Sequence, residues 1–536
     1  MEQWLQTPSH ASIGHDTAIR KYCSERLEQE QQGDSDEASN ELEMWSSSGT
    51  NSPSLAAAEQ VEFVDGLINM EWCYEEDGNL ASKCGFASHS ETVTISRNYG
   101  IEEFMALLTP GSSIEEEIDV ISSIEPTNSE SLIPPHDGDA MNEMSQGVDE
   151  GLHLVHLLLA CAEAVGCRDS SLANSILSQI WGLANPHGDS MQRVSFCFAL
   201  GLTTRLALQQ NVGLRGSFSN LGLDLELPSK EDKVEGFRLL YQLTPYIAFG
   251  FTIANDAIDQ AAHGKDALHI IDLGMAHTLQ WPPLIRTLAS RLEGPPKLRI
   301  TGVDVDPNSK ELEENMKVLA MEASSLGVPF EFQLIVGPLS PSLLNMETLG
   351  SREGEALFVN SIMYLHKHVK ESRGSLKSIL QSIRKLNPTL FTLVEQEANH
   401  NGPFFLGRFL ESLHYYSAIF DSLEASLPRP SPQRMKIERS HFAEEIRDII
   451  AYEGLKRVER HERADQWRRQ LGRAGFQVVG LKSMSQARMM LSVYGCDGYT
   501  LATEKGGLVL GWKGRSIMLA STWQVHSASP SNKTHE

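Results

Sequence analysis

The sequence is poor in the features that mark secreted, metal-finger and membrane proteins. Its 536 residues include only seven cysteines, at Cys23, Cys73, Cys84, Cys161, Cys167, Cys197 and Cys496. No two of them form a Cys-x-x-Cys pair, so neither a disulfide framework nor a zinc finger is indicated, and a reducing compartment is expected. No apolar run approaches the roughly 18 residues that cross a bilayer, so no membrane partner is expected. Met1-Glu2-Gln3 does not resemble the start of a signal peptide.

Basic residues are scarce in the first 150 positions. Residues 1–150 hold 31 acidic and 5 basic residues out of 71 and 45 in the whole chain, so residues 151–536 carry 40 of each sign. The acidic region is rich in Ser, Glu, Asp and Asn and cannot bury enough apolar surface to offset its ordering entropy. We therefore predict an acidic disordered region over 1–150, ahead of a folded region over 151–536. Patches at 61–72 and 101–108 alternate acidic and apolar residues, which favours partner-binding segments, with solvated linker as the alternative.

Residues 151–265 predict a leucine-rich helical region. Further helices are expected near 171–183, 190–208, 231–243 and 247–262. The first helix contains a Leu-x-x-Leu-Leu pattern, which is typical of coactivator docking, but leucine-rich helices often produce it from core leucines, and core packing is the favoured interpretation. Consecutive leucines span about 200° of a helix, so at least one should point away from the primary core. The predicted dimer or partner surface comprises Leu154, Leu157, Leu158 and Leu159.

Residues 266–536 predict a sheet domain. An apolar run at 267–273 precedes a helical pattern that begins at Trp281 and has Pro282 and Pro283 in its first turn, where proline is tolerated. A second apolar run follows at 298–305, which completes a βαβ unit and indicates a parallel sheet. More strands are expected at 330–335, 355–361 and 389–395. The C-terminal segments 508–512 and 519–523 predict an antiparallel hairpin.

Several motifs resemble, in the same order, those of the plant GRAS family of transcriptional regulators, from about residue 152 onward. The matching residues are His269, Ile270, Ile271, Asp272, Gln280, Trp281, Leu298, Arg299, Ile300, Thr301, Trp467, Gly475, Trp512, Ser521 and Trp523. Thr522 replaces the alanine of the family's usual Ser-Ala-Trp ending. The resemblance implies a nuclear regulator, with dual nuclear and cytoplasmic residence as an alternative. It also implies homodimers or heterodimers with other GRAS proteins, and recruitment to promoters by DNA-binding transcription factors.

The branch of the family is suggested by the N-terminal region. The sequence lacks the Asp-Glu-Leu-Leu-Ala motif of the gibberellin-signalling branch, which argues against membership of that branch. The run Leu158–Val165 resembles the corresponding run in proteins of that branch, whereas the acidic region over 1–150 differs from theirs. The overall resemblance favours the group of regulators required for arbuscule development in mycorrhizal symbiosis.

The alternation of strands and helices also resembles the Rossmann-like fold of S-adenosylmethionine methyltransferases, to which the GRAS family is related. Such an enzyme needs a glycine-rich turn after its first strand, so that the backbone can approach the cofactor. Gly274 begins this turn, but residues 275–279 have side chains where the later glycines would be. Asp304 and Asp306 lie where a ribose-binding acid would be, but an acid without the glycine-rich turn is weak evidence for a cofactor site. No Ser/His/Asp order, HExxH or phosphate-binding loop is present. We expect no catalysis and no cofactor; a methyltransferase-like protein that binds a small ligand is the alternative.

Three arginine-rich stretches, at 434–439, 457–463 and 468–473, raise the question of direct binding to promoter DNA. Acidic residues interleave with them, and residues 151–536 carry no net charge, so unaided affinity for phosphate should be weak. We expect a solvated, salt-bridged helix over 457–473. Core packing is expected for Trp512 and Trp523, and for His269 on its buried strand. Asp272 is expected to accept backbone N–H bonds from the following turn.

Overall fold

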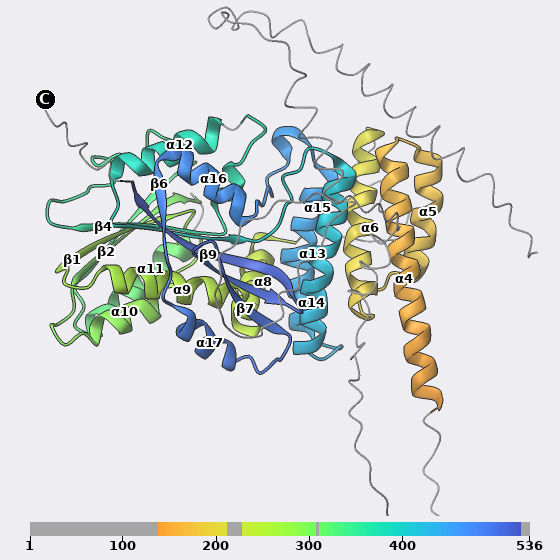
Figure 1. The fold of residues 1–536 in the computed structure, drawn as a ribbon, viewed down its shortest axis with the longest axis horizontal. Coiled ribbons are helices and arrows are strands. Elements are labelled where there is room, and N and C mark those ends of the chain that lie inside the picture. Colours follow the sequence, from red (N-terminus) through yellow and green to blue (C-terminus); the bar gives the residue numbers. More distant parts are fainter. Residues whose placement is uncertain (1–137, 212–227, 307–309, 373, 527–536) are drawn as a thin grey trace, which may run out of the picture. The chain divides into compact units, whose positions relative to one another are not determined.

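A computed structural model describes residues 138–211, 228–306, 310–372 and 374–526. Within these ranges the chain forms a mixed sheet with helices on both faces and a helical cap at one end (Figure 1). The predicted partner-binding patches at 61–72 and 101–108 lie outside the described residues. The first described helix, α4 (Gly138–Gly166), begins ahead of the boundary expected at 150/151.

The sheet has nine strands in the order β3-β2-β1-β4-β5-β9-β8-β7, and β6 also pairs with β9. Strands β1 to β5 are parallel, whereas β9 runs antiparallel to β5. This arrangement confirms the predicted Rossmann-like α/β core. The strands are β1 (Ala267–Leu273), β2 (Lys297–Val305), β3 (Phe330–Val336), β4 (Ala356–Ile362), β5 (Leu390–Gln396), β6 (Phe476–Val479), β7 (Tyr499–Glu504), β8 (Gly507–Trp512) and β9 (Arg515–Val525).

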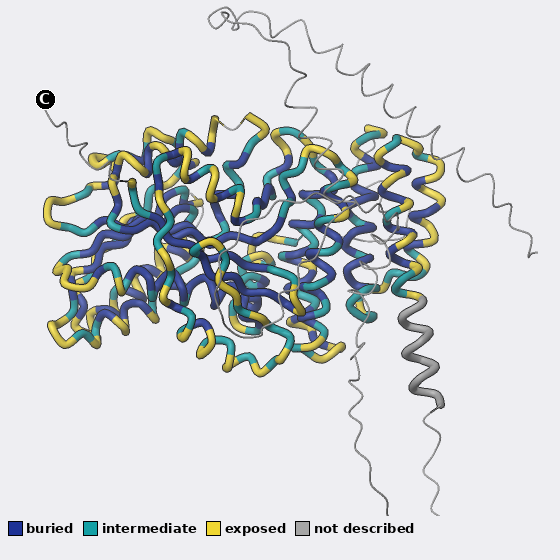
Figure 2. The backbone as a smooth tube through the Cα atoms, viewed as in Figure 1, coloured by how far each residue is buried: buried dark blue, intermediate teal, exposed yellow. Residues whose placement is uncertain are grey.

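Each face of the sheet has its own apolar core. Successive side chains of a strand point to opposite faces, so Ile270 packs toward α10 and α11 while Ile271 packs toward α12 and α16. Both residues are fully buried. In Figure 2 the segments that form the middle of the sheet are mostly dark blue, the colour of buried residues. The helices beside the sheet are α8 (Lys230–Leu243), α9 (Pro245–Ala261), α10 (Trp281–Ala289), α11 (Lys310–Ser325), α12 (Gly374–Leu386), α16 (Ala464–Ala474) and α17 (Met484–Ser492).

The cap is built from two separate parts of the chain. Helices α4, α5 (Ser170–Leu183) and α6 (Ser190–Gln209) pack with α13 (Phe405–Ser426) and α15 (Ala443–Ala451), with α14 (Pro432–Ile437) and a π-turn, η2 (Glu438–Phe442), beside them (Figure 1). The cap expected within 151–265 therefore recruits helices from beyond residue 400, while α8 and α9 lie along the sheet. Helix α13 explains this, because it is buried on several sides and contacts both the cap and β9.

The helix predicted over 457–473 is wrong in its first half. A short turn, η3 (Gly454–Lys456), leads into extended backbone at 457–463, and only then does α16 begin. The carboxylate of Asp448 accepts the backbone N–H groups of Val458 (2.8 Å) and Glu459 (2.7 Å), which holds the extended path. Across the described ranges, no helix combines the length and the apolar character needed to span a bilayer.

Candidate functional site

A cavity of about 570 Å³ lies at the carboxyl ends of β1, β2 and β4, beside α8. The order of the strands reverses between β1 and β4, and ligand sites of open α/β sheets form at this kind of switch point. The turn after β1, the end of β2 and the segment after β4 each contribute to its walls. The cavity is therefore the candidate functional site of the sheet domain.

Tyr364 fills the place where a cofactor would approach the turn after β1. Gly274 has a positive φ of 72°, and a Cβ atom there would lie 1.9 Å from Cδ2 of Tyr364. The Tyr364 hydroxyl donates a hydrogen bond to Asp304, the acid expected to bind a ribose. Burial, followed by the Asp304 carboxylate, raises the pKa of Tyr364, so the hydroxyl keeps its proton. These residues do not fit S-adenosylmethionine, because the turn and the acid are both engaged by the chain itself.

Two backbone outliers hold this arrangement. Asp304 and Met363 adopt positive φ angles of 60° and 50°, which side chains with a Cβ rarely adopt. Asp304 accepts the hydrogen bond from Tyr364, and Met363 directly precedes Tyr364. In the turn after β1, His277 stacks on Phe237 of α8 with ring centroids 4.2 Å apart and planes 8° apart. Burial, with His441 nearby, lowers the pKa of His277 to about 4, so this stacked imidazole is neutral.

A buried cluster of histidines and carboxylates adjoins the cavity. His366, in the turn η1 (Leu365–His368) after β4, lies between two carboxylates: its Nδ1 is 2.7 Å from Glu395 Oε2 and its Nε2 is 2.8 Å from Glu459 Oε2. His461 Nε2 lies 3.4 Å from the same Glu459 oxygen. His461 Nδ1 is 3.0 Å from Nδ1 of His400, which stacks on Tyr416. His366 and Glu459 also line the cavity.

The electrostatics of the cluster are set by burial and by the two carboxylates. Burial opposes a charge on His366, but Glu395 and Glu459 outweigh it and raise the pKa of His366 to about 9. Burial lowers the pKa of His461, and it lowers the pKa of His400 to about 3, so both are neutral imidazoles. The cluster therefore combines one imidazolium, two carboxylates and two neutral rings.

Comparison with known proteins identifies the family. The sequence pattern of the GRAS domain family matches residues 154–524. The chain belongs to the GRAS family. A crystal structure of SCL7 from Oryza sativa is similar at 30% identity with a TM-score of 0.61, covering 69% of this chain and 99% of that one.

Relatives within the GRAS family share most of the matched region. The GRAS family protein RAD1 of Lotus japonicus is 46% identical over 386 residues, covering 70% of this chain and 75% of the relative. RAD1 of Medicago truncatula is 45% identical over 383 residues, covering 70% and 73%. DELLA protein GAI1 of Vitis vinifera is 39% identical over 386 residues, covering 70% and 62%. These values agree with the predicted resemblance to the required-for-arbuscule-development group rather than to DELLA proteins.

The GRAS motif of β1 and β2 forms a cross-strand network. His269 pairs with Arg299 in the register of the two strands, and its Nδ1 accepts a hydrogen bond from the Arg299 guanidinium at 2.9 Å. Its Nε2 is 2.9 Å from the hydroxyl of Thr301. Burial, followed by Arg299, lowers the pKa of His269 to about 4. The structure thus places His269 in the core, with both ring nitrogens hydrogen-bonded. The apolar members of the motif are also buried: Ile270, Ile271, Leu298 and Ile300.

Asp272 and Gln280 meet above β1 through Asn360 of β4. The Asn360 amide donates to Asp272 Oδ1 (2.8 Å) and to Gln280 Oε1 (3.0 Å). The carboxylate thus joins a side-chain network instead of accepting the backbone N–H bonds expected for it. Gln280 leads directly into Trp281, which is fully buried at the start of α10.

Of the C-terminal motif residues, Trp467 and Trp523 belong to the core on the α12 and α16 face of the sheet, and Trp512 lies beside α13. Trp467 of α16 is fully buried, and Gly475 ends that helix with a φ of 94°. Trp512 donates its indole N–H to Asp421 at 2.6 Å. Trp523, opposite Phe391 across the β5–β9 pair, donates to the Ser521 hydroxyl at 3.0 Å. The three tryptophans are buried, which agrees with the core packing expected for Trp512 and Trp523.

The leucines predicted to form a partner surface are mostly internal. Leu154 and Leu158 are fully buried, Leu157 is 9% exposed, and only Leu159 is half-buried. Helix α4 packs against α5 on one side and against α6 and α13 on the other, so two neighbouring layers cover consecutive leucines. Leu154, Leu157 and Leu158 therefore belong to the cap's interior and cannot line an external face.

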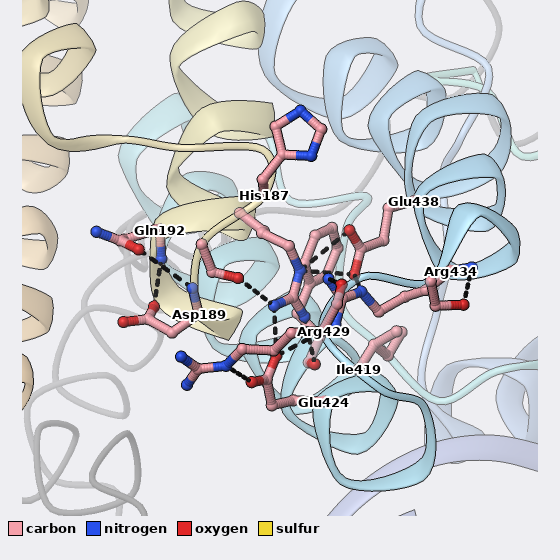
Figure 3. A network of polar contacts seen from close by, with 12 residues as sticks. His187, Asp189, Gln192, Ile419, Glu424, Arg429, Arg434 and Glu438 are labelled. Atoms are coloured by element: carbon pink, nitrogen blue, oxygen red, sulfur yellow. Dashed lines mark hydrogen bonds and ion pairs between the residues drawn. The ribbon is translucent and has the colours of Figure 1, made fainter. Parts of the chain in front are cut away.

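The arginine-rich stretches divide between the interior and the surface. Arg468, Arg469 and Arg473 of α16 are exposed, as expected for a solvated face. In the first two stretches, Arg434, Arg457 and Arg460 are buried, contrary to that expectation. Arg434 is buried in a network with Glu424 and Glu438 that ties α13 and α14 to α6 (Figure 3). Arg193 of α6 completes it, with Nε 3.0 Å from Glu438 Oε1. In the extended segment at 457–463, Arg457 and Arg460 are each only 1% exposed, which withdraws them from contact with DNA phosphates.

Sequence reasoning missed the cluster of His366, Glu395, His400, Glu459 and His461. Its members come from four segments, and the contact between His366 and Glu459 spans 93 positions. Two signals were available: carboxylates at the end of the fifth predicted strand, and the unusual mixture of Arg, Glu and His near residue 460. From the sequence alone, the mixture near residue 460 predicts a solvated helix, and the carboxylates receive no functional interpretation.

Proposed function

We propose that this GRAS protein is a transcriptional regulator that acts in the nucleus through protein–protein contacts. It forms homodimers or heterodimers with other GRAS proteins, reaches promoters through DNA-binding transcription factors, and resides in part in the cytoplasm. Membership of the family carries this proposal, because the match covers residues 154–524. The similarity to RAD1 proteins supports a role in arbuscular-mycorrhizal symbiosis.

The sheet domain supports a regulator over an enzyme. Tyr364 covers Gly274 and engages Asp304, so the position that serves cofactor chemistry in related folds is filled by the chain. The remaining cavity keeps a small-ligand site as the alternative function. Recruitment by a partner is favoured over direct DNA binding, since Arg434, Arg457 and Arg460 are buried. Among the arginine-rich stretches, Arg439 and the three arginines of 468–473 stay exposed, and acidic residues interleave with the stretches.

Helix α5 supports dimerisation through the cap. It is an outer helix of the cap in Figure 1, and Figure 2 shows exposed positions along it. None of its residues is charged, and Leu172 is 50% exposed. The cores of protein interfaces are depleted in charged residues, so this face suits contact with a second cap.

The dimer is tested by light scattering on the purified full chain at tens of micromolar. Leu172→Glu places a charge in the proposed contact and should convert a dimer to a monomer without changing circular dichroism. Leu292→Glu is the matched control, because Leu292 is fully exposed just after α10, at the other end of the fold in Figure 1. If the wild type is monomeric, or if the Leu172→Glu variant is still dimeric, α5 is not the dimer contact.

Regulation is tested by tethering the chain to a heterologous DNA-binding domain upstream of a reporter in plant cells. The proposal predicts that the tethered chain changes reporter output and that the untethered chain leaves this reporter unchanged. Reporter output equal to that of the DNA-binding domain alone would contradict a regulatory function.

A further inference from the structure

We propose that His366, Glu459 and His461 bind one divalent metal ion of the zinc class, a role separate from the regulatory contacts above. Each residue offers one ligand atom, and the three ligand atoms lie within 4.8 Å of one another. The two contacts to Glu459 Oε2 measure 2.8 Å from His366 Nε2 and 3.4 Å from His461 Nε2. Zinc bonds of about 2.0–2.2 Å in a tetrahedral site separate donor atoms by roughly 3.3 Å, which is close to both contacts with Glu459. The two histidine nitrogens lie no more than 4.8 Å apart and would approach each other on binding.

The second ring nitrogen of each histidine is held by another buried side chain. His366 Nδ1 is 2.7 Å from Glu395 Oε2, and His461 Nδ1 is 3.0 Å from His400 Nδ1. With its proton on Nδ1, His461 directs its Nε2 lone pair at Glu459. His366 donates from both ring nitrogens and offers its Nε2 lone pair once the proton facing Glu459 has left. Metal-binding histidines in proteins almost always have their other nitrogen anchored in this way, which fixes the tautomer and the ring orientation.

An unpartnered buried atom points independently to a missing ligand. His461 is fully buried, and its Nε2 has no hydrogen-bond partner among the described residues, although Glu459 is near. A buried polar atom left unpaired is unfavourable by about 1–3 kcal/mol unless something binds it. A cation placed between the two rings and the carboxylate would satisfy this atom directly.

The donor set selects the class of metal. Two imidazole nitrogens and one carboxylate suit zinc and neighbouring transition metals, whereas calcium and magnesium prefer oxygen donors alone. His366 and Glu459 line the cavity, so the ion has an entry path and a fourth position open to solvent or a ligand. On binding, the proton that His366 shares with Glu459 leaves to solvent, and the metal takes its place.

The test uses the full chain, purified without a polyhistidine tag and stripped with a chelator. Zinc uptake is measured by competition with a chromophoric indicator, and cobalt is added separately to record its visible spectrum. The proposal predicts one zinc ion per chain and an intense four- or five-coordinate cobalt spectrum without thiolate bands. Uptake of no zinc, or cobalt bands from cysteine ligation, would overturn it.

Variants locate the site. Glu459→Gln keeps the shape of the side chain and removes its charge, and His461→Asn removes one imidazole; each should weaken zinc affinity at least roughly 100-fold. His153→Asn is the control, because His153 is exposed on α4. Circular dichroism checks each fold. If Glu459→Gln and His461→Asn are folded and bind zinc as tightly as His153→Asn does, the assignment is wrong. If one of the two variants fails to fold, the zinc affinity of the other variant and the cobalt spectrum of the wild type decide whether the site exists.

Discussion

At the scale of single residues, Asp272 shows how burial sets the chemistry of the sheet's edge. Burial raises the pKa of Asp272 to about 7, and the hydrogen bond from Asn360 only partly offsets this. The carboxyl group thus holds a proton in the folded chain over a pH range in which the unfolded chain has lost it. The contribution of Asp272 to folding stability must therefore fall as pH rises from about 4 to about 7.

We predict that Asp272→Asn flattens this pH dependence. The asparagine oxygen can still accept from Asn360 but carries no charge, so the variant should match the wild type near pH 4 and exceed it at pH 8. The difference at pH 8 should be roughly 2–4 kcal/mol, since one pKa unit corresponds to about 1.4 kcal/mol. Urea denaturation at several pH values measures this, and parallel curves for the two proteins would contradict the assigned pKa.

At the scale of elements, the end of α16 shows why one glycine of the C-terminal motif is required. Gly475 has a φ of 94°, and a Cβ atom there would lie 2.6 Å from Nε of Arg384. Glycine reaches this left-handed conformation without strain, which lets the chain turn from α16 directly into β6.

Gly475→Ala should destabilise the fold by about 1–3 kcal/mol through backbone strain and the contact with Arg384. Gly472→Ala in the same helix is the matched control, because a Cβ atom there meets nothing within 4 Å. Alanine favours a helix interior over glycine, so the control should be neutral or more stable by about 0.5–1 kcal/mol. Thermal melting compares the two variants, and equal losses of stability would refute the account.

Elements with one dominant periodicity could be predicted from the sequence, whereas long-range polar partners could not. The alternating environment of Ile270 and Ile271 and the spacing after Trp281 define β1 and α10 locally. Arg457 and His461, in contrast, lie in extended backbone because their partners are distant in sequence; His400 contacts both of them. Similarly, Leu157 and Leu158 are consecutive and point in different directions around α4, so the sequence predicts that one of them is external. Both are buried because α5 on one side and α6 and α13 on the other cover the helix.

At the scale of the whole molecule, the charge distribution separates the acidic N-terminal residues from the folded region. Residues 1–137 lie outside the described part of the chain, and the prediction of disorder there rests on the sequence. A chain starting at Gly138 keeps all of α4 and should unfold cooperatively at the same temperature as the full chain. Differential scanning calorimetry makes the comparison, and a lower midpoint for the shortened chain would show that the acidic residues pack on the domain.

The central claim is that this GRAS protein has a Rossmann-like sheet whose switch-point turn after β1 is closed by the chain's own residues. Tyr364 lies against Gly274 and engages Asp304, so S-adenosylmethionine cannot approach the turn after β1. Isothermal titration calorimetry of the full chain with S-adenosylmethionine tests this most directly. The account predicts no binding up to roughly 1 mM ligand, equivalent to a binding free energy weaker than about −4 kcal/mol. Saturable binding with a micromolar Kd and one site per chain would contradict it.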